Sequence, residues 1–264
     1  MGDAFWSGWG WPLATGLIGF VYVGLLLAQW WQRRKPHQLA WTVGFLLYAV
    51  AAVMEAYSEF TGDWNPIVYR IYIVMAASMV GFLGLGTLYL VTKKRLWGNL
   101  YLTFVLACLG VFLYGVFTNE LDTQKLVAGI TVGGSALGSG GSFPRIMSLP
   151  LNITGTLLLL GGSAWSIAKF WPKKEYRYRA WANVLIIIGT LIIAGAGSMA
   201  RAGQTVGLYP AEMVASAVLL VGFLMASTLE KGAGAIRQRL AEQRTTESVA
   251  GEADIVYESD QVSS

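Results

Sequence analysis

Cysteine, histidine and charged side chains are scarce in this chain of 264 residues. It contains one cysteine, Cys108, and one histidine, His37, and 13% of its residues are charged. One cysteine forms no disulfide framework. One histidine excludes bis-histidine haem, multi-histidine zinc and carboxylate–histidine di-iron sites. Soluble domains carry about 25% charged residues, so this composition excludes a water-soluble enzyme of this size.

Apolar residues are abundant instead and make up 55% of the chain. A helix that crosses a membrane needs about 20 mostly apolar residues. The sequence therefore predicts an all-α integral membrane protein of seven transmembrane helices in contact with the lipid bilayer. The seven runs are Trp11–Trp31, Leu39–Phe60, Ile67–Thr92, Leu100–Thr118, Leu151–Trp171, Trp181–Ala200 and Tyr209–Leu229.

The basic residues predict the orientation of these helices. Of the 19 Lys and Arg, 14 fall on one side of the membrane, in groups at 33–35, 93–95, 173–179 and 231–244. Because basic residues favour the cytoplasmic side, we expect the N-terminus outside and the C-terminus in the cytoplasm, with the protein in the cell (plasma or inner) membrane. The basic residues gather on no single solvated face, so the net charge of +4 indicates no nucleic-acid binding.

Three segments are expected outside the membrane. Residues 1–10 form an external N-terminus without the basic start of a cleavable signal peptide. Residues 119–149 are a glycine-rich external loop, with one short helix expected near Leu121–Ile130. Residues 232–264 begin basic and turn acidic, which predicts a short cytoplasmic helix followed by a disordered tail.

The chain also contains an internal similarity. Its elements recur at offsets of 138 to 141 residues: Pro12 and Pro150 at span starts, Ala40-Trp41 and Ala180-Trp181, and Gly81-Phe82-Leu83 and Gly222-Phe223-Leu224. We therefore predict two three-helix repeats, 11–92 and 150–231, joined by a connector helix at 93–118. Because each copy has three spans, one connecting span is needed for both copies to start on the same side of the membrane. The two copies are then parallel and are related by a pseudo-two-fold axis along the membrane normal.

This 3+1+3 plan, with the N-terminus outside, is similar to that of SWEET and PQ-loop transporters. The resemblance covers the seven spans and implies movement of a small solute, but the Pro-Gln motif of those families is missing, because Pro12 and Pro150 precede leucine. Microbial rhodopsins share the helix number and orientation. The seventh span, however, has no lysine for a retinal Schiff base. The segments Gly84–Tyr89 and Asn152–Ser163 resemble those of bacterial multi-pass proteins, which implies no activity.

Ionisable residues within the apolar spans indicate where a site could lie. Glu55 is 16 residues beyond Leu39, or about 24 Å along a helix, which places it in the outer leaflet. Glu59 lies one turn above Glu55 on the same face. Tyr69 and Arg70 begin the next helix after a short turn, so we expect them to reach Glu55 or Glu59.

The repeat adds the second half of this site. At an offset of 140, Ser58 corresponds to Ser198, Thr61 to Arg201, and Tyr72 to Glu212. We therefore predict a polar substrate site near the outer ends of the second, third, sixth and seventh spans. Its candidate residues are Glu55, Glu59, Tyr69, Arg70, Tyr72, Asn152, Ser198, Arg201 and Glu212. The alternative is that these charges reach the headgroups, with Glu55 and Arg70 as a structural pair.

Three functional hypotheses remain open. The first is a small-solute transporter. The second is a membrane sensor or accessory subunit that docks a protein through residues 232–264, and the third is a membrane protein with a quinone or lipid site. The sequence shows no nucleophile–base pair, P-loop or nucleotide fingerprint, which argues against an enzyme. No haem, zinc or retinal ligand set is present, so we expect no cofactor.

Overall fold

The computed structural model describes residues 8–92, 94–128, 134–138, 142–202 and 207–225. Within them, seven helices are long and apolar enough to cross a membrane, which confirms the predicted helical, multi-pass class. They are α2 (Gly10–Arg33), α3 (Pro36–Thr61), α4 (Pro66–Val91), α5 (Arg95–Thr118), α6 (Phe143–Phe170), α7 (Arg177–Arg201) and a last helix at Leu208–Met225, called the final helix below.

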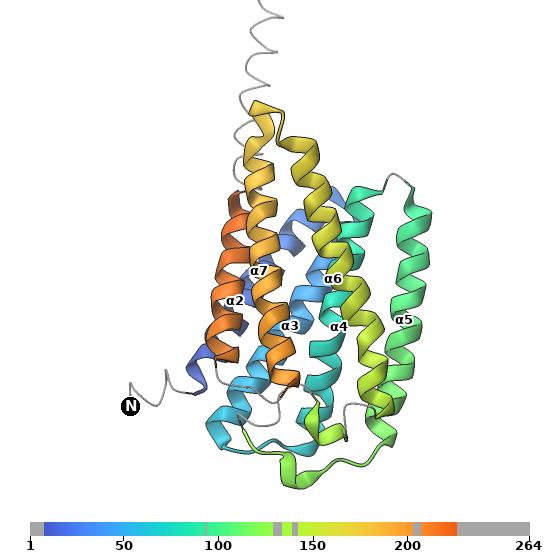
Figure 1. The fold of residues 1–264 in the computed structure, drawn as a ribbon, viewed down its shortest axis with the longest axis vertical. Coiled ribbons are helices and arrows are strands. Elements are labelled where there is room, and N and C mark those ends of the chain that lie inside the picture. The colour runs from blue at the N-terminus through green and yellow to red at the C-terminus, as the bar shows by residue number, and fades with distance from the viewer. Residues whose placement is uncertain (1–7, 93, 129–133, 139–141, 203–206, 226–264) are drawn as a thin grey trace, which may run out of the picture.

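The helices stand side by side in one bundle and alternate in direction (Figure 1). The α3–α4 turn and the α5–α6 connection lie at the lower end in this view, which we call the loop end. α2 begins at the loop end, and the final helix runs away from it. This arrangement brings Glu55 of α3, Tyr72 of α4 and the start of the final helix to the same end of the bundle.

The α3–α4 turn follows from its sequence. α3 ends at Gly62, whose φ of 86° is a left-handed conformation that glycine adopts without a steric penalty. The side chain of Asn65 then accepts hydrogen bonds from the backbone N–H groups of Ile67 and Val68. Pro66 occupies the first turn of α4, where a missing N–H costs nothing. The short turn holds the ends of α3 and α4 together.

The start of α6 differs from the prediction. α6 begins at Phe143, so residues 143–149 belong to the helix and not to the expected loop, and Pro150 lies inside the helix instead of opening it. Pro144 takes the first-turn position that suits proline. Between α5 and α6, the described part of the region where a short helix was expected, residues 121–128, contains the 3₁₀ turn Thr123–Lys125, and a second 3₁₀ turn follows at Ser135–Leu137.

The described parts of this connection pack against the loop end. The backbone N–H of Trp64 donates to the carbonyl oxygen of Leu126 at 3.0 Å, and that of Ala136 donates to the Tyr69 hydroxyl at 3.3 Å. Trp64, Tyr69, Leu126 and Ala136 are all buried in one cluster. Farther out, a hydrogen bond from Lys125 lowers the pKa of the Asp122 carboxyl. The predicted tail, residues 232–264, lies outside the described residues.

Glycines set how closely the helices approach. α2 lies so close to α3 that a Cβ on Gly19 would come within 3.1 Å of the Ala49 Cα, and α4 meets α6 at Gly84 and Gly155. The final helix packs on α7, where Leu219 lies over Gly189. It also reaches α2, where the rings of Tyr22 and Phe223 are 5.7 Å apart. The final helix thereby closes the bundle.

Candidate functional site

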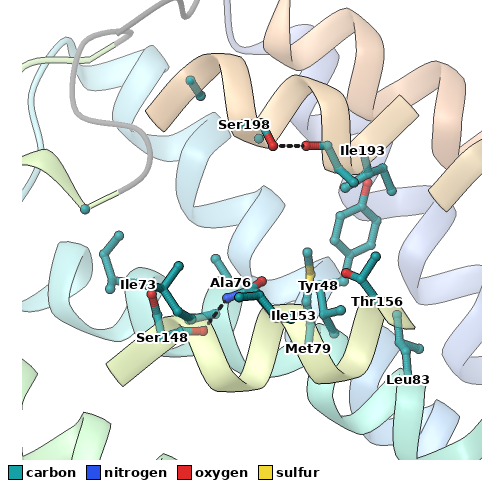
Figure 2. A pocket seen from close by; sticks show the side chains of 18 of the residues that line it. Tyr48, Ile73, Ala76, Met79, Leu83, Ser148, Ile153, Thr156, Ile193 and Ser198 are labelled. Atoms are coloured by element: carbon teal, nitrogen blue, oxygen red, sulfur yellow. Dashed lines mark hydrogen bonds between the residues drawn. The ribbon is translucent and has the colours of Figure 1, made fainter. Parts of the chain in front are cut away.

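A cavity of about 650 Å³ lies among α4, α6, α7 and the final helix. Ile153 and Thr156 of α6 line one wall, Ile193 and Ser198 of α7 line the opposite wall, and Tyr48 of α3 projects toward it (Figure 2). Small-molecule sites in proteins have volumes of about 300–1,000 Å³. The cavity is therefore large enough for a small organic molecule.

The polar lining residues concentrate toward the loop end of this cavity. There α4 contributes Tyr72, α6 contributes Arg145, Ser148 and Asn152, α7 contributes Ser198, and the final helix contributes Glu212. Farther along the same helices the lining is formed mainly by Val80, Leu83, Leu159 and Leu219, with Thr156 and Thr190 as polar exceptions. The cavity is thus amphipathic along its length.

Glu55 and Glu212 form a carboxyl pair beside the cavity. Glu55 is 3% exposed, and its Oε1 accepts a hydrogen bond of 2.6 Å from the Tyr72 hydroxyl. Its carboxyl lies next to that of Glu212, a residue that lines the cavity. The repeat offset, which relates Tyr72 to Glu212, had placed Glu55, Tyr72 and Glu212 in one predicted site. The structure brings these three residues together.

The carboxyl pair continues into a cluster of hydroxyl groups. The hydroxyls of Tyr48 and Ser216 share a hydrogen bond of 2.5 Å, and both are within hydrogen-bonding distance of the Glu212 carbonyl oxygen. Tyr48 is buried and lines the cavity. Ser216 was not among the candidate residues; its signal in the sequence is a serine one turn after Glu212 in an apolar span.

Glu59 has a separate partner. Its Oε1 accepts a hydrogen bond of 2.8 Å from the Tyr209 hydroxyl of the final helix. Within the part of the chain that the structure describes, no lysine or arginine forms an ion pair with Glu55, Glu59 or Glu212. Nor does any group of three or more His, Cys, Asp or Glu in those residues suit a metal ion.

Arg70 does not reach the glutamates, so the predicted Arg70 contact and the alternative Glu55–Arg70 pair are both wrong. Its guanidinium donates to the carbonyl oxygens of Val116 and of Asn119, the latter at 2.9 Å. The last carbonyl groups of a helix have no partner inside the helix, so the end of α5 offers strong acceptors to this side chain. Tyr69 is buried in the loop-end cluster and does not line the cavity.

Asn152 and Ser198 line the cavity, and Figure 2 shows Ser198 on its α7 wall. The Asn152 amide donates to the Ser148 carbonyl oxygen at 2.8 Å, and the Ser198 hydroxyl donates to the Ala194 carbonyl oxygen at 2.7 Å. The side chain of Arg201 lies outside the described residues. Arg145 was missed, because the prediction placed it in a loop rather than in the first turn of α6.

Comparisons with protein families, with curated proteins and with solved structures found no match for this chain. The 3+1+3 resemblance to SWEET and PQ-loop transporters therefore stays a prediction, as do the orientation and the repeat. What the structure establishes is a multi-pass helical membrane protein with a cavity that Glu212 lines and the buried Glu55 adjoins.

Proposed function

We propose that this protein is a transporter that binds a small amphiphilic solute in the cavity among α4, α6, α7 and the final helix. The observation that carries the proposal is the position of the polar lining. Most of the hydrogen-bonding side chains lie toward the loop end of the cavity, among apolar ones such as Ile73 and Leu208, and the lining farther along the helices is mainly apolar. A solute with a polar head and an apolar body matches both parts.

Movement of the solute is supported by unequal packing in the bundle. In the most apolar stretch of each helix, half of the residues are buried in α3 and in α4, compared with 17% in α6 and 11% in α7. α6 and α7 make up much of the cavity wall, and they diverge toward the loop end in Figure 1. Weakly buried helices around a binding site are the elements that can shift when a transporter alternates its access.

The neighbour pattern of the helices supports the predicted repeat. α4 packs on α6, and the final helix packs on α2 through Tyr22 and Phe223. A pseudo-two-fold axis that relates 11–92 to 150–231 would interchange these two contacts. The cavity then lies between the two halves, where transporters built from repeats hold their substrates.

A second candidate function is a site for a lipid-soluble molecule, such as a quinone or a lipid, without transport. The apolar lining formed by Val80, Leu83 and Leu159 favours it. The hypothesis of a sensor or accessory subunit depends on residues 232–264, which lie outside the described residues, and it stays a prediction.

Two glycines of α7 provide a matched test. A Cβ added at either Gly195 or Gly197 would meet no atom within 4 Å, but only Gly197 lines the cavity. Gly197→Trp therefore fills the cavity, whereas Gly195→Trp adds the same side chain outside it. The assay is counterflow of a radiolabelled panel of small amphiphiles (aromatic amino acids, monoamines and short-chain acids) in proteoliposomes.

We expect the wild type and Gly195→Trp to exchange at least one member of the panel, and Gly197→Trp to lose that exchange. Equilibrium binding of the same solute is measured in parallel. Binding without counterflow would contradict transport and support the lipid-soluble ligand site. Equal counterflow by both variants would exclude this cavity as the site.

A further inference from the structure

We propose that the solute is a lipophilic organic cation, recognised by one negative charge that Glu55 and Glu212 share. This inference rests on the proposed function, because it names the chemical class that the same cavity accepts. It depends on three features of the described residues: the adjacent carboxyl groups, the lack of an ion pair to either of them, and the aromatic lining.

The first feature is the charge of the pair. Two adjacent carboxyl groups retain at least one proton, because two negative charges side by side in apolar surroundings repel strongly, and the proposed charge is the one on the other carboxyl. The Tyr72 hydroxyl donates to Glu55 at 2.6 Å and stabilises the remaining charge. Glu212 lines the cavity, so a solute bound there lies close to the shared charge.

The second feature is that nothing described around the pair neutralises it. The groups that face it are Tyr48 and Glu59 from α3, Tyr72 from α4, and Tyr209 and Ser216 from the final helix. All of these are hydroxyl or carboxyl groups. A buried charge without a counter-charge is costly, so binding of a cation next to Glu212 would be favourable.

The third feature is the aromatic lining. Phe45, Tyr48, Tyr72 and Phe112 all line the cavity, and aromatic faces attract cations within about 6 Å. Opposed to this is Arg145, which lines the cavity on α6 and donates to the Gly138 carbonyl oxygen at 3.2 Å. If Arg145 governed recognition, the preferred solute would be an anion.

Two ions of one shape separate these possibilities. Tetraphenylphosphonium and tetraphenylborate are nearly isosteric and carry opposite charges. Binding of each is measured by equilibrium dialysis on the purified full chain in nanodiscs of neutral lipid, with empty nanodiscs subtracted. We expect tetraphenylphosphonium to bind at least about tenfold more tightly, since a Coulomb interaction at contact distance exceeds 1.4 kcal/mol at an effective dielectric constant of about 20.

Variants then locate the charge. The double variant Glu55→Gln/Glu212→Gln removes it and should abolish the preference for the cation, with a larger effect than either single change. Glu59→Gln is the matched control, because Glu59 does not line the cavity and Gln can still accept from Tyr209. An unchanged preference in the double variant, or a preference for tetraphenylborate in the wild type, would overturn the inference.

The outcomes also separate this inference from the proposed function. If both ions bind equally and Gly197→Trp removes both, the cavity is a binding site without the inferred charge selectivity. If the panel shows neither counterflow nor binding, and neither ion binds, the proposed function fails together with the inference. The preference of the wild-type protein tests the idea even where the double variant does not fold.

Discussion

The helices α2 to α4 and the helices α6 and α7 are built from similar residues but are packed differently. Most glycines of α2 to α4 lie against neighbouring helices: Gly19 faces Ala49, and Gly44 faces Leu83. On α7, Gly195 and Gly197 have open space where a Cβ would be added. Gly19 and Gly44 therefore mark close packing among α2 to α4, whereas Gly195 and Gly197 mark open space near the loop end of α7.

This difference separates stability from function. Close approach of helices gives the van der Waals contact that holds membrane helices together, so α2 to α4 form the stable part of the bundle. The space beside Gly197 belongs to the cavity, where a ligand would replace the missing contacts. Substitutions that are severe in the first region should be mild in the second.

The largest expected effect is at Gly19. In Gly19→Leu the new side chain meets the Ala49 backbone, with the Cα 3.1 Å from the added Cβ. Because backbone cannot move aside as a side chain can, we expect a loss of about 3 kcal/mol or more, at the upper end of over-packing costs. Thermal unfolding in detergent, followed by circular dichroism, measures this loss.

Gly195→Leu is the control for this comparison. It introduces the same side chain into a membrane helix where nothing lies within 4 Å, so the melting temperature should stay close to that of the wild type. Equal destabilisation by both variants would show that the two regions do not differ in packing.

The sequence predicted the helices well because length and hydropathy are local properties. Each of the seven runs lies largely within one of the seven helices, and Trp11–Trp31, for example, lies inside α2. The start of α6 was misplaced because Pro144 and Pro150 both suit a first turn, and only tertiary packing decides which one takes it. The glycines were ambiguous for the same reason, since the partner of a glycine is a residue far away in the chain.

A middle-sized effect is expected at the tyrosine that supports the carboxyl pair. Tyr72→Phe removes the 2.6 Å hydrogen bond to Glu55, which is 3% exposed. A buried carboxyl without this donor should destabilise the bundle by about 1–2 kcal/mol. Tyr209→Phe removes the comparable bond to Glu59, where both partners are only half-buried and water or headgroups can substitute. A smaller loss at Tyr209 in the same unfolding assay would confirm the contrast, and a larger one would reverse it.

The candidate site was predicted in part. The meeting of Glu55, Tyr72 and Glu212 could be predicted, because counting residues along each helix gives the depth of each side chain in the membrane. Arg70 was assigned wrongly because its depth was right but its direction around α4 was not. The acceptors that it uses, the carbonyl groups of Val116 and Asn119, depend on how α5 docks, and no local pattern in the sequence specifies that docking.

The smallest expected effect compares two arginines at the loop end. Arg70 donates to two carbonyl oxygens at the end of α5, whereas Arg145, beside the cavity, donates to one at 3.2 Å. We expect Arg70→Met to cost about 1–2 kcal/mol, since it leaves helix-terminal carbonyl groups without their charged donor. Arg145→Met should cost less than about 1 kcal/mol, because it loses a single weaker bond. Chemical denaturation of both variants in mixed micelles measures the difference. If Arg145→Met proved the more destabilising change, Arg145 would help to hold the bundle together and would not only line the cavity. The difference in packing between α2 to α4 and α7 would then not extend to the loop end.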